Sequence, residues 1–183
     1  MRAFILSAAL TVSWLALATP ASAFDLADPD GDTRARNEFA IGADLLQNGH
    51  YEEAERHLET ALAKFHDDIT ILKYLAFIHR TIARHRVGTS HAGEIQLANT
   101  YYHRALDIDP DDRSLLEYMG EFYLELDDPG AAHAKMAELE RLCPRGCPQR
   151  DTLAHSIADY VPPPPPPPVA LAPPEQLNPD ASY

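Results

Sequence analysis

The two cysteines are the residues whose type and spacing could do chemistry most directly. Cys143 and Cys147 are the only cysteines in the chain, and a Pro-Arg-Gly segment separates them. They could form a disulfide that fastens a short turn, with Gly146 supplying the backbone freedom that so tight a ring needs. They could instead be reactive, because Pro148 is well placed to begin a helix and a thiol at a helix N-terminus can have a lowered pKa. The spacing is not C-x-x-C and no strand-rich thioredoxin pattern surrounds it, so we favour the disulfide.

A metal site is the third interpretation of the same turn. Two sulfurs could hold a soft ion such as Cu(I), with His133 or His155 nearby. The chain has nine histidines, but no pair has the H-x-x-x-H or H-x-x-E-H spacing that places two ligands on one helical face, and no methionine cluster supports copper. We expect no metal and no cofactor. Thiol-redox or copper-handling chemistry at Cys143 and Cys147 is kept as the alternative function.

Nothing else in the sequence indicates an enzyme. It contains no Gly-rich phosphate loop, no G-x-S-x-G motif and no conspicuous carboxylate pair in a helical or strand context. The formal net charge of −13 opposes binding to nucleic acid and to anionic lipid through long-range repulsion. We therefore expect no enzymatic activity and no nucleic-acid partner.

Both ends of the chain have compositions that cannot belong to a folded core. An apolar run of about 16 residues leads to Pro20-Ala21-Ser22-Ala23, which is typical of a secretory signal peptide cleaved after Ala23. The run is short of the roughly 20 residues that span a bilayer, so we expect a periplasmic or secreted protein without stable membrane insertion after cleavage.

At the other end, seven prolines at 162–168 favour an extended polyproline II form and predict a disordered tail over 161–183.

Helical repeats must position these features, and the first lies at about 35–68. Gly42 stands midway in its first expected helix, where the paired helix must approach closely, and Gly49 ends that helix. Ala54 on the second helix is small enough for the two helices to interlock, and Leu58 fills the space between them. The segment therefore predicts a helical hairpin.

The second repeat, at about 69–112, has the same closing pattern but is too long. It ends at Ala105-Leu106-Asp107-Ile108-Asp109-Pro110, where the proline stops the helix. About ten residues are in excess, and they fall in the turn-rich stretch 86–93 between the two expected helices. This predicts a loop insertion within the repeat.

The third repeat, at about 113–146, has a glycine midway in its first helix, Gly120, and closes at Pro144. Its turn departs from the pattern, because Asp127 stands where a glycine is usual. A final helix over 148–160 has an apolar stripe at helical spacing and one polar face, which suits a segment that covers the end of a repeat array.

This succession resembles the tetratricopeptide-repeat (TPR) family over about Asn37 to Pro144. The resemblance implies an all-α, TPR-like helical-hairpin solenoid of three repeats plus a capping helix. The Cys-x-x-Gly-Cys turn also resembles one found in small exported bacterial TPR proteins. The organisation it implies is a signal peptide at 1–23, an N-terminal extension at 24–36, a TPR-like domain at 37–160 and a proline-rich disordered tail at 161–183.

TPR proteins stack their hairpins so that the first helices line a concave face, where peptides or partner proteins often bind. Carried over to this sequence, that geometry predicts a partner-binding face made of Phe39, Leu46, Lys73, Phe77, Arg80, Glu117, Glu121 and Glu125. The face would be apolar at one end, basic in the middle and acidic at the other, which suits a segment with an apolar anchor and mixed charges. The Lys-Asn set with which some TPR domains clamp a C-terminal carboxylate is not found here. The resemblance implies a protein–protein interaction or scaffold module of the cell envelope with a protein or peptide partner.

Overall fold

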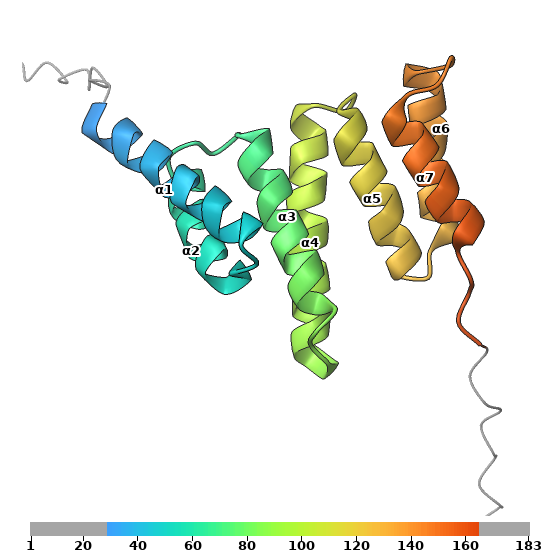
Figure 1. Ribbon diagram of the computed structural model, residues 1–183, viewed down its shortest axis with the longest axis horizontal. Helices are drawn as coiled ribbons and strands as arrows, with labels where there is room; N and C mark the ends of the chain where they lie inside the picture. Colours follow the sequence, from blue (N-terminus) through green and yellow to red (C-terminus); the bar gives the residue numbers. More distant parts are fainter. Residues whose placement is uncertain (1–28, 165–183) are drawn as a thin grey trace, which may run out of the picture.

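The computed structural model describes residues 29–164, and within them every regular element is an α-helix (Figure 1). The seven helices are α1 (Pro29–Gln47), α2 (Tyr51–Leu62), α3 (Ile69–Ala83), α4 (Gly88–Ile108), α5 (Arg113–Glu125), α6 (Pro129–Leu142) and α7 (Pro148–Asp159). The all-α prediction is confirmed for this part of the chain. The predicted signal peptide, the start of the N-terminal extension and the tail from residue 165 onward lie outside the described residues. None of the described helices is long and apolar enough to cross a membrane.

Consecutive helices pack as antiparallel pairs. α1 packs on α2, α3 on α4 and α5 on α6, while α7 packs on both α5 and α6. Figure 1 shows the pairs following one another along the long axis, with α1 and α2 at one end and α6 and α7 at the other. Most of the apolar core runs continuously from α2 to α5, and a smaller cluster of Leu116, Leu139 and Leu153 joins α5, α6 and α7. Burial of these side chains is the main stabilising term for such pairs.

The turns of the first and third hairpins have the same backbone geometry. Gly49 has φ +78° and Asp127 has φ +60°, which is the left-handed region. In both turns the N–H of the next residue donates to the carbonyl five residues back, at 2.9 Å. Aspartate adopts this conformation more readily than most side chains. The departure from glycine in the third turn therefore leaves the turn geometry unchanged.

Two helical glycines mark close approaches between helices. A Cβ on Gly42 would lie 2.7 Å from Leu58 Cγ, and a Cβ on Gly120 would lie 2.5 Å from Leu153 Cδ2. Gly42 thus lets α2 approach α1, as the sequence predicts. Gly120 does not repeat that role toward its paired helix, because the side chain that fills its place comes from α7.

The predicted loop insertion at 86–93 is wrong, because α4 begins at Gly88 and runs for 21 residues. Residues 88–93 of this stretch are therefore helical. Tertiary contacts hold them there: His91 Nδ1 lies 2.9 Å from the carbonyl of Ala83, and Glu94 lies 2.7 Å from His79. These contacts outweigh the weak helix propensity of Gly93, which costs about 1 kcal/mol relative to alanine.

The first helix also begins earlier than predicted. α1 starts at Pro29, so residues 29–36 of the predicted N-terminal extension are helical. Ala35 is buried, and Asp32 forms an ion pair with Lys64 just beyond α2 at 3.3 Å. The core contact of Ala35 gives these first turns a reason to be helical that the repeat pattern does not contain.

Candidate functional site

A groove of about 470 Å³ crosses α1, α3 and α5, the first helices of the three hairpins. It is lined by Leu46, Thr70, Lys73, Tyr74, Phe77, Arg80, Arg84, Ser114, Tyr118 and Glu121. We call it the aromatic groove, because Tyr74, Phe77 and Tyr118 contribute rings to it. Phe77 and Tyr118 are each 38% exposed, which is high for side chains of this size.

Five of the eight predicted partner-binding residues line this groove: Leu46, Lys73, Phe77, Arg80 and Glu121. The other three lie elsewhere. Phe39 stacks on Tyr74 with ring centroids 6.1 Å apart and lines a separate cavity of about 240 Å³. Glu125 lies beside a cavity of about 400 Å³ at the far end of α5. Glu117 is half-buried and lines none of the cavities described here.

The family resemblance does not point to half of the groove: Thr70, Tyr74, Arg84, Ser114 and Tyr118. For the two residues on α5, Ser114 and Tyr118, the sequence contains a helical spacing that could have pointed to them. Ser114, Tyr118 and Glu121 have the i, i+4, i+7 spacing of one helix face, which shares Glu121 with the face that the resemblance selects and is rotated from it by about 30°.

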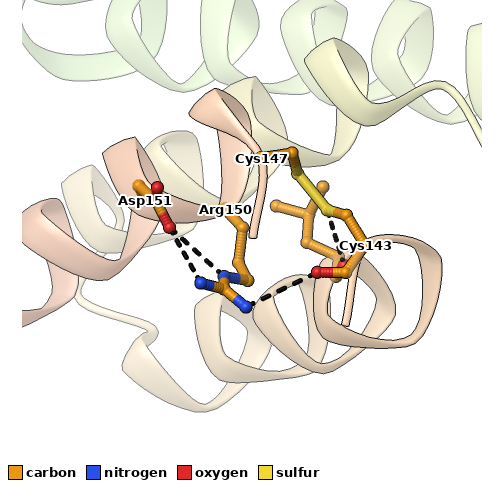
Figure 2. Close-up of a disulfide and its surroundings, with 5 residues drawn as sticks. Cys143, Cys147, Arg150 and Asp151 are labelled. Carbon is orange, nitrogen blue, oxygen red and sulfur yellow. Dashed lines mark hydrogen bonds and ion pairs between the residues drawn. A yellow bond between two sulfur atoms is a disulfide. The ribbon is translucent and has the colours of Figure 1, made fainter. Parts of the chain in front are cut away.

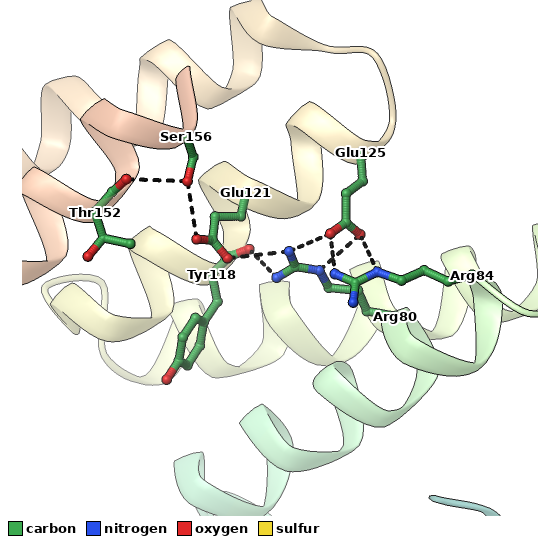
Figure 3. Close-up of polar contacts among 7 residues, drawn as sticks. All are labelled: Arg80, Arg84, Tyr118, Glu121, Glu125, Thr152 and Ser156. Carbon is green, nitrogen blue, oxygen red and sulfur yellow. Dashed lines mark hydrogen bonds and ion pairs between the residues drawn. The ribbon is translucent and has the colours of Figure 1, made fainter. Parts of the chain in front are cut away.

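Arg80 ties the second hairpin to the third (Figure 3). Its Nε and Nη2 donate to the two carboxylate oxygens of Glu125 at 3.0 and 2.6 Å, and Nη2 also donates to Glu121 at 3.3 Å. Its Nη1 donates to the carbonyl of Tyr118 at 3.3 Å. Arg84 donates to the same Glu125 carboxylate. Because Arg80 is only 6% exposed, its first role is to join α3 to α5 rather than to meet a ligand.

The ionisation of these groups follows from the same contacts. Burial by itself lowers the pKa of Arg80, but the hydrogen bonds to Glu125 and its negative charge outweigh burial and raise it. Burial alone raises the pKa of Glu125, and the hydrogen bonds from Arg80 and Arg84 outweigh it, so the net pKa is lowered. Both groups are therefore charged at neutral pH.

Lys73 is paired in a similar way at the other end of the groove. Its Nζ donates to Asp112 at 2.7 Å and to the Ser114 hydroxyl at 3.1 Å, which again joins α3 to the beginning of α5. The Asp112 carboxylate also accepts from the N–H of Leu115 as the N-cap of α5. Burial raises the pKa of Asp112, but the hydrogen bonds from Lys73 and Ser114 prevail and lower it.

The charged groups of the aromatic groove are thus paired within the protein. A ligand that took Lys73 or Arg80 as its partner would first have to break an ion pair within the protein. The exposed apolar surface has no such competition, since Phe77 and Tyr118 present much of their rings to solvent. The groove is therefore chemically suited to an apolar, extended ligand more than to a charged one.

The turn between α6 and α7 is closed by a disulfide (Figure 2). Cys143 and Cys147 form a disulfide, and both residues are buried. Cys147 is the N-cap of α7 with a proline directly after it, and Gly146 has φ +101°, as the sequence predicts. Arg150 of α7 lies over the turn and donates to the carbonyl of Cys143 at 3.5 Å. The bond thus connects the end of α6 to the start of α7.

The histidines considered as metal ligands have other contacts within the fold, and so does the buried His79. His133 and His155 each place Nδ1 at 2.7 Å from the carbonyl four residues earlier on their own helix. His79 is buried, stacks on Tyr101 and lies 2.7 Å from Glu94. Within residues 29–164 no three histidine, cysteine, aspartate or glutamate side chains are grouped so that they could hold a metal ion.

The sequence matches no protein-family model, and no curated protein is similar to it at a significant level. The function is therefore inferred from the geometry of the chain itself.

Proposed function

We propose that this chain is a non-enzymatic protein-binding module that holds an extended segment of a partner protein in the aromatic groove. The observation that carries the proposal is the pair of exposed rings, Phe77 on α3 and Tyr118 on α5, in a groove whose charged groups are already paired. Exposed aromatic rings in a concave site are the usual energetic anchors of protein recognition.

We further propose that the helix pairs are TPR-like repeats that stack as a short solenoid, with α7 as its cap. Three features support this. The helices pair consecutively, two of the three hairpin turns share one backbone geometry, and Ala54 and Ala132 are fully buried in α2 and α6. In such a stack the groove lies on the face made by the first helices, where an extended segment can contact several repeats at once.

The proposed compartment is the cell envelope or the exterior, reached through the N-terminal signal segment. The disulfide between Cys143 and Cys147 supports this placement, because such bonds persist in oxidising compartments. No contact in the described residues favours the redox or copper alternative over a structural bond.

The test is affinity capture of the partner from the native envelope fraction, followed by binding measurements with purified components. Phe77→Ala and Tyr118→Ala should each weaken binding by about 5- to 30-fold, as truncation of an anchoring ring costs about 1–2 kcal/mol. Arg80 is unsuitable for this test, because its replacement would loosen the junction between α3 and α5.

Leu97→Ala is the matched control. Leu97 is 43% exposed, lies on α4 and does not line the groove, so its truncation should change affinity by less than twofold. Equal affinities for the two ring variants and the control would show that the partner binds elsewhere, and the proposal would be wrong.

A further inference from the structure

We propose that the aromatic groove is also the docking site of the chain's own proline-rich segment, residues 165–183, which competes in cis with the partner. This inference rests on the groove of the proposed function and adds a regulator to it. Three observations carry it: where the described chain leaves α7, what the groove exposes, and what the segment contains.

The described chain leaves α7 at the end of the groove. Tyr160, directly after α7, lines the cavity of about 400 Å³ together with Arg80, Leu124, Glu125 and Ser156. Arg80 and Glu121 line both this cavity and the aromatic groove. Tyr160 is held in place by a hydrogen bond from its hydroxyl to Asp127. The described chain therefore leaves α7 next to the groove.

The chain between this exit and the proposed ligand can act as a spacer. Val161 is 82% exposed, and the prolines at 162–164 are exposed as well. Four residues of extended chain span roughly 12 Å, so the following segment starts within about that distance of Tyr160.

The groove matches the chemistry of the following ten residues, Pro165 to Pro174. This stretch reads PPPPVALAPP and has no charged side chain. Six of its ten residues are prolines, so at these positions burial leaves no backbone N–H donor without a partner. The charged groups of the groove need no partner from the ligand, because Lys73 and Arg80 already form ion pairs within the protein. Aromatic rings against a polyproline II ligand are a general recognition mode for such sequences.

The lengths also agree. The groove runs along α3 from Thr70 to Arg84, which corresponds to about 21 Å of helix. Ten residues of polyproline II extend over about 31 Å. The uncharged stretch can therefore cover the whole groove with a few residues to spare, and the segment is already tethered beside it, which makes its effective concentration high.

The consequence for the partner is competition. If the segment occupies the groove for nine-tenths of the time, the partner's apparent affinity is about tenfold weaker than its intrinsic affinity. A partner then binds strongly only when it is concentrated or when the tail is held elsewhere.

The test is paramagnetic relaxation in the full chain as the cell processes it. A nitroxide spin label on an Ala172→Cys variant, with the native disulfide kept oxidised, should remove at least half of the amide signal intensity of Tyr74, Phe77 and Tyr118. The same label on a variant with the prolines 165–168, 173 and 174 changed to serine should leave these signals unchanged. Undiminished signals in the proline-containing chain would overturn the proposal.

Two further measurements separate the possible failures. Mixing an isotope-labelled chain that has no spin label with an unlabelled spin-labelled chain should give no broadening, and broadening in this mixture alone would show a second copy as the occupant and overturn the cis proposal. The proline-to-serine variant should bind the captured partner about tenfold more tightly than the native chain does. Broadening of groove signals without any partner binding would support docking of the tail in the groove and reject the proposed function. Equal partner affinity in the native chain and in the proline-to-serine variant would reject competition between the tail and the partner.

Discussion

Arg80 of α3 donates two hydrogen bonds, from two different nitrogens, to the single carboxylate of Glu125 on α5. This bidentate pair crosses the junction between the second and third hairpins and is strengthened by Arg84 on the same carboxylate. Tyr102 and Phe122 add an apolar contact at the same junction, with ring centroids 5.4 Å apart. The relative position of Phe77 and Tyr118, one on each side, depends on these contacts.

Replacement of Arg80 by methionine should lower the free energy of unfolding by about 3 kcal/mol. The change leaves Glu125 without its main partner in a partly buried place, and breaking one side of such a pair typically costs about 3–5 kcal/mol when both groups are buried. Glu125 keeps about a third of its side chain exposed, so we expect the lower end. Urea denaturation followed by circular dichroism measures the loss.

Arg141→Met is the control for that experiment. Arg141 is paired with Asp111 at 2.6 Å, but both side chains are more than half exposed. Exposed pairs contribute about 0–1 kcal/mol. Losses of equal size in the two variants would mean that Arg80 does not hold the junction.

The contribution of the Glu125 carboxylate to stability should decrease as the pH falls, because its pKa is lowered in the folded state. Its folded pKa is lowered below the ordinary 4.5, so its carboxylate stabilises the fold above that pH and ceases to do so as the pH falls through the lowered value. Glu125→Gln should therefore be less stable than the native chain at pH 7, and the difference should shrink as the pH falls below about 4.5. Unfolding curves at pH 3 to 7 measure it; a difference that stays constant with pH would contradict the assignment.

Glu117 should behave in the opposite way. Burial, followed by repulsion from Glu121, raises its pKa above 4.5, so the charged form is disfavoured in the folded state. The protonated form of Glu117 is compatible with the fold at low pH, and the native chain becomes less stable as the pH rises through the raised pKa and the carboxylate ionises. Glu117→Gln should thus be more stable than the native chain at pH 7 and equal to it near pH 3, in the same unfolding series. A destabilised Gln variant at pH 7 would indicate that the carboxylate has a stabilising partner.

Alanine in place of the interface glycines should separate close packing from helix propensity. Gly42→Ala and Gly120→Ala should each lower the unfolding free energy by about 1–3 kcal/mol, because the new methyl overlaps Leu58 or Leu153. Gly93→Ala should instead raise it by about 0.5–1 kcal/mol, since nothing lies within 4 Å of its Cβ position in α4. Thermal melts of the three variants give the comparison. A stabilised Gly42→Ala would contradict the close approach of α1 and α2.

Loss of the disulfide should loosen α7 without affecting binding in the groove. The bond closes a short loop, so paired replacement of Cys143 and Cys147 by serine should cost about 2 kcal/mol, at the low end for such bonds. Hydrogen exchange should increase in α7 first, because the turn ties that helix to α6. Partner affinity that fell as strongly as with Tyr118→Ala would show that the turn takes part in binding.

The hairpins could be predicted from the sequence where small residues and turns follow a repeat. Gly42, Gly49 and the closing proline of the second repeat are signals of local structure, and local structure follows from local sequence. The error at 86–93 has the opposite origin. Glycines at 88 and 93 favour a loop locally, whereas contacts with α3, between residues 8 and 15 positions apart, hold the segment as a helix.

The candidate site was harder to predict than the fold for the same reason. Repeat positions place Phe77 and Arg80 on the correct face of α3, but they cannot tell an exposed ring from a guanidinium that is buried against another helix. The role of Arg80 depends on Glu125, which lies 45 residues away. Tyr118 is absent from the predicted face because the orientation of α5 is set by the hydrogen bonds from Arg80 and Lys73, and by its core contacts.

The most direct test of the central claim is site-specific photo-crosslinking in cells. The photoreactive residue p-benzoylphenylalanine would replace Phe77 or Tyr118 in the groove, and Leu97 or Ile108 on α4 as controls of similar exposure. The aromatic groove, as the partner-binding surface, should give covalent adducts with another protein from the two groove positions and none from α4. Adducts of equal yield from α4, or no adducts from Phe77 and Tyr118, would contradict it.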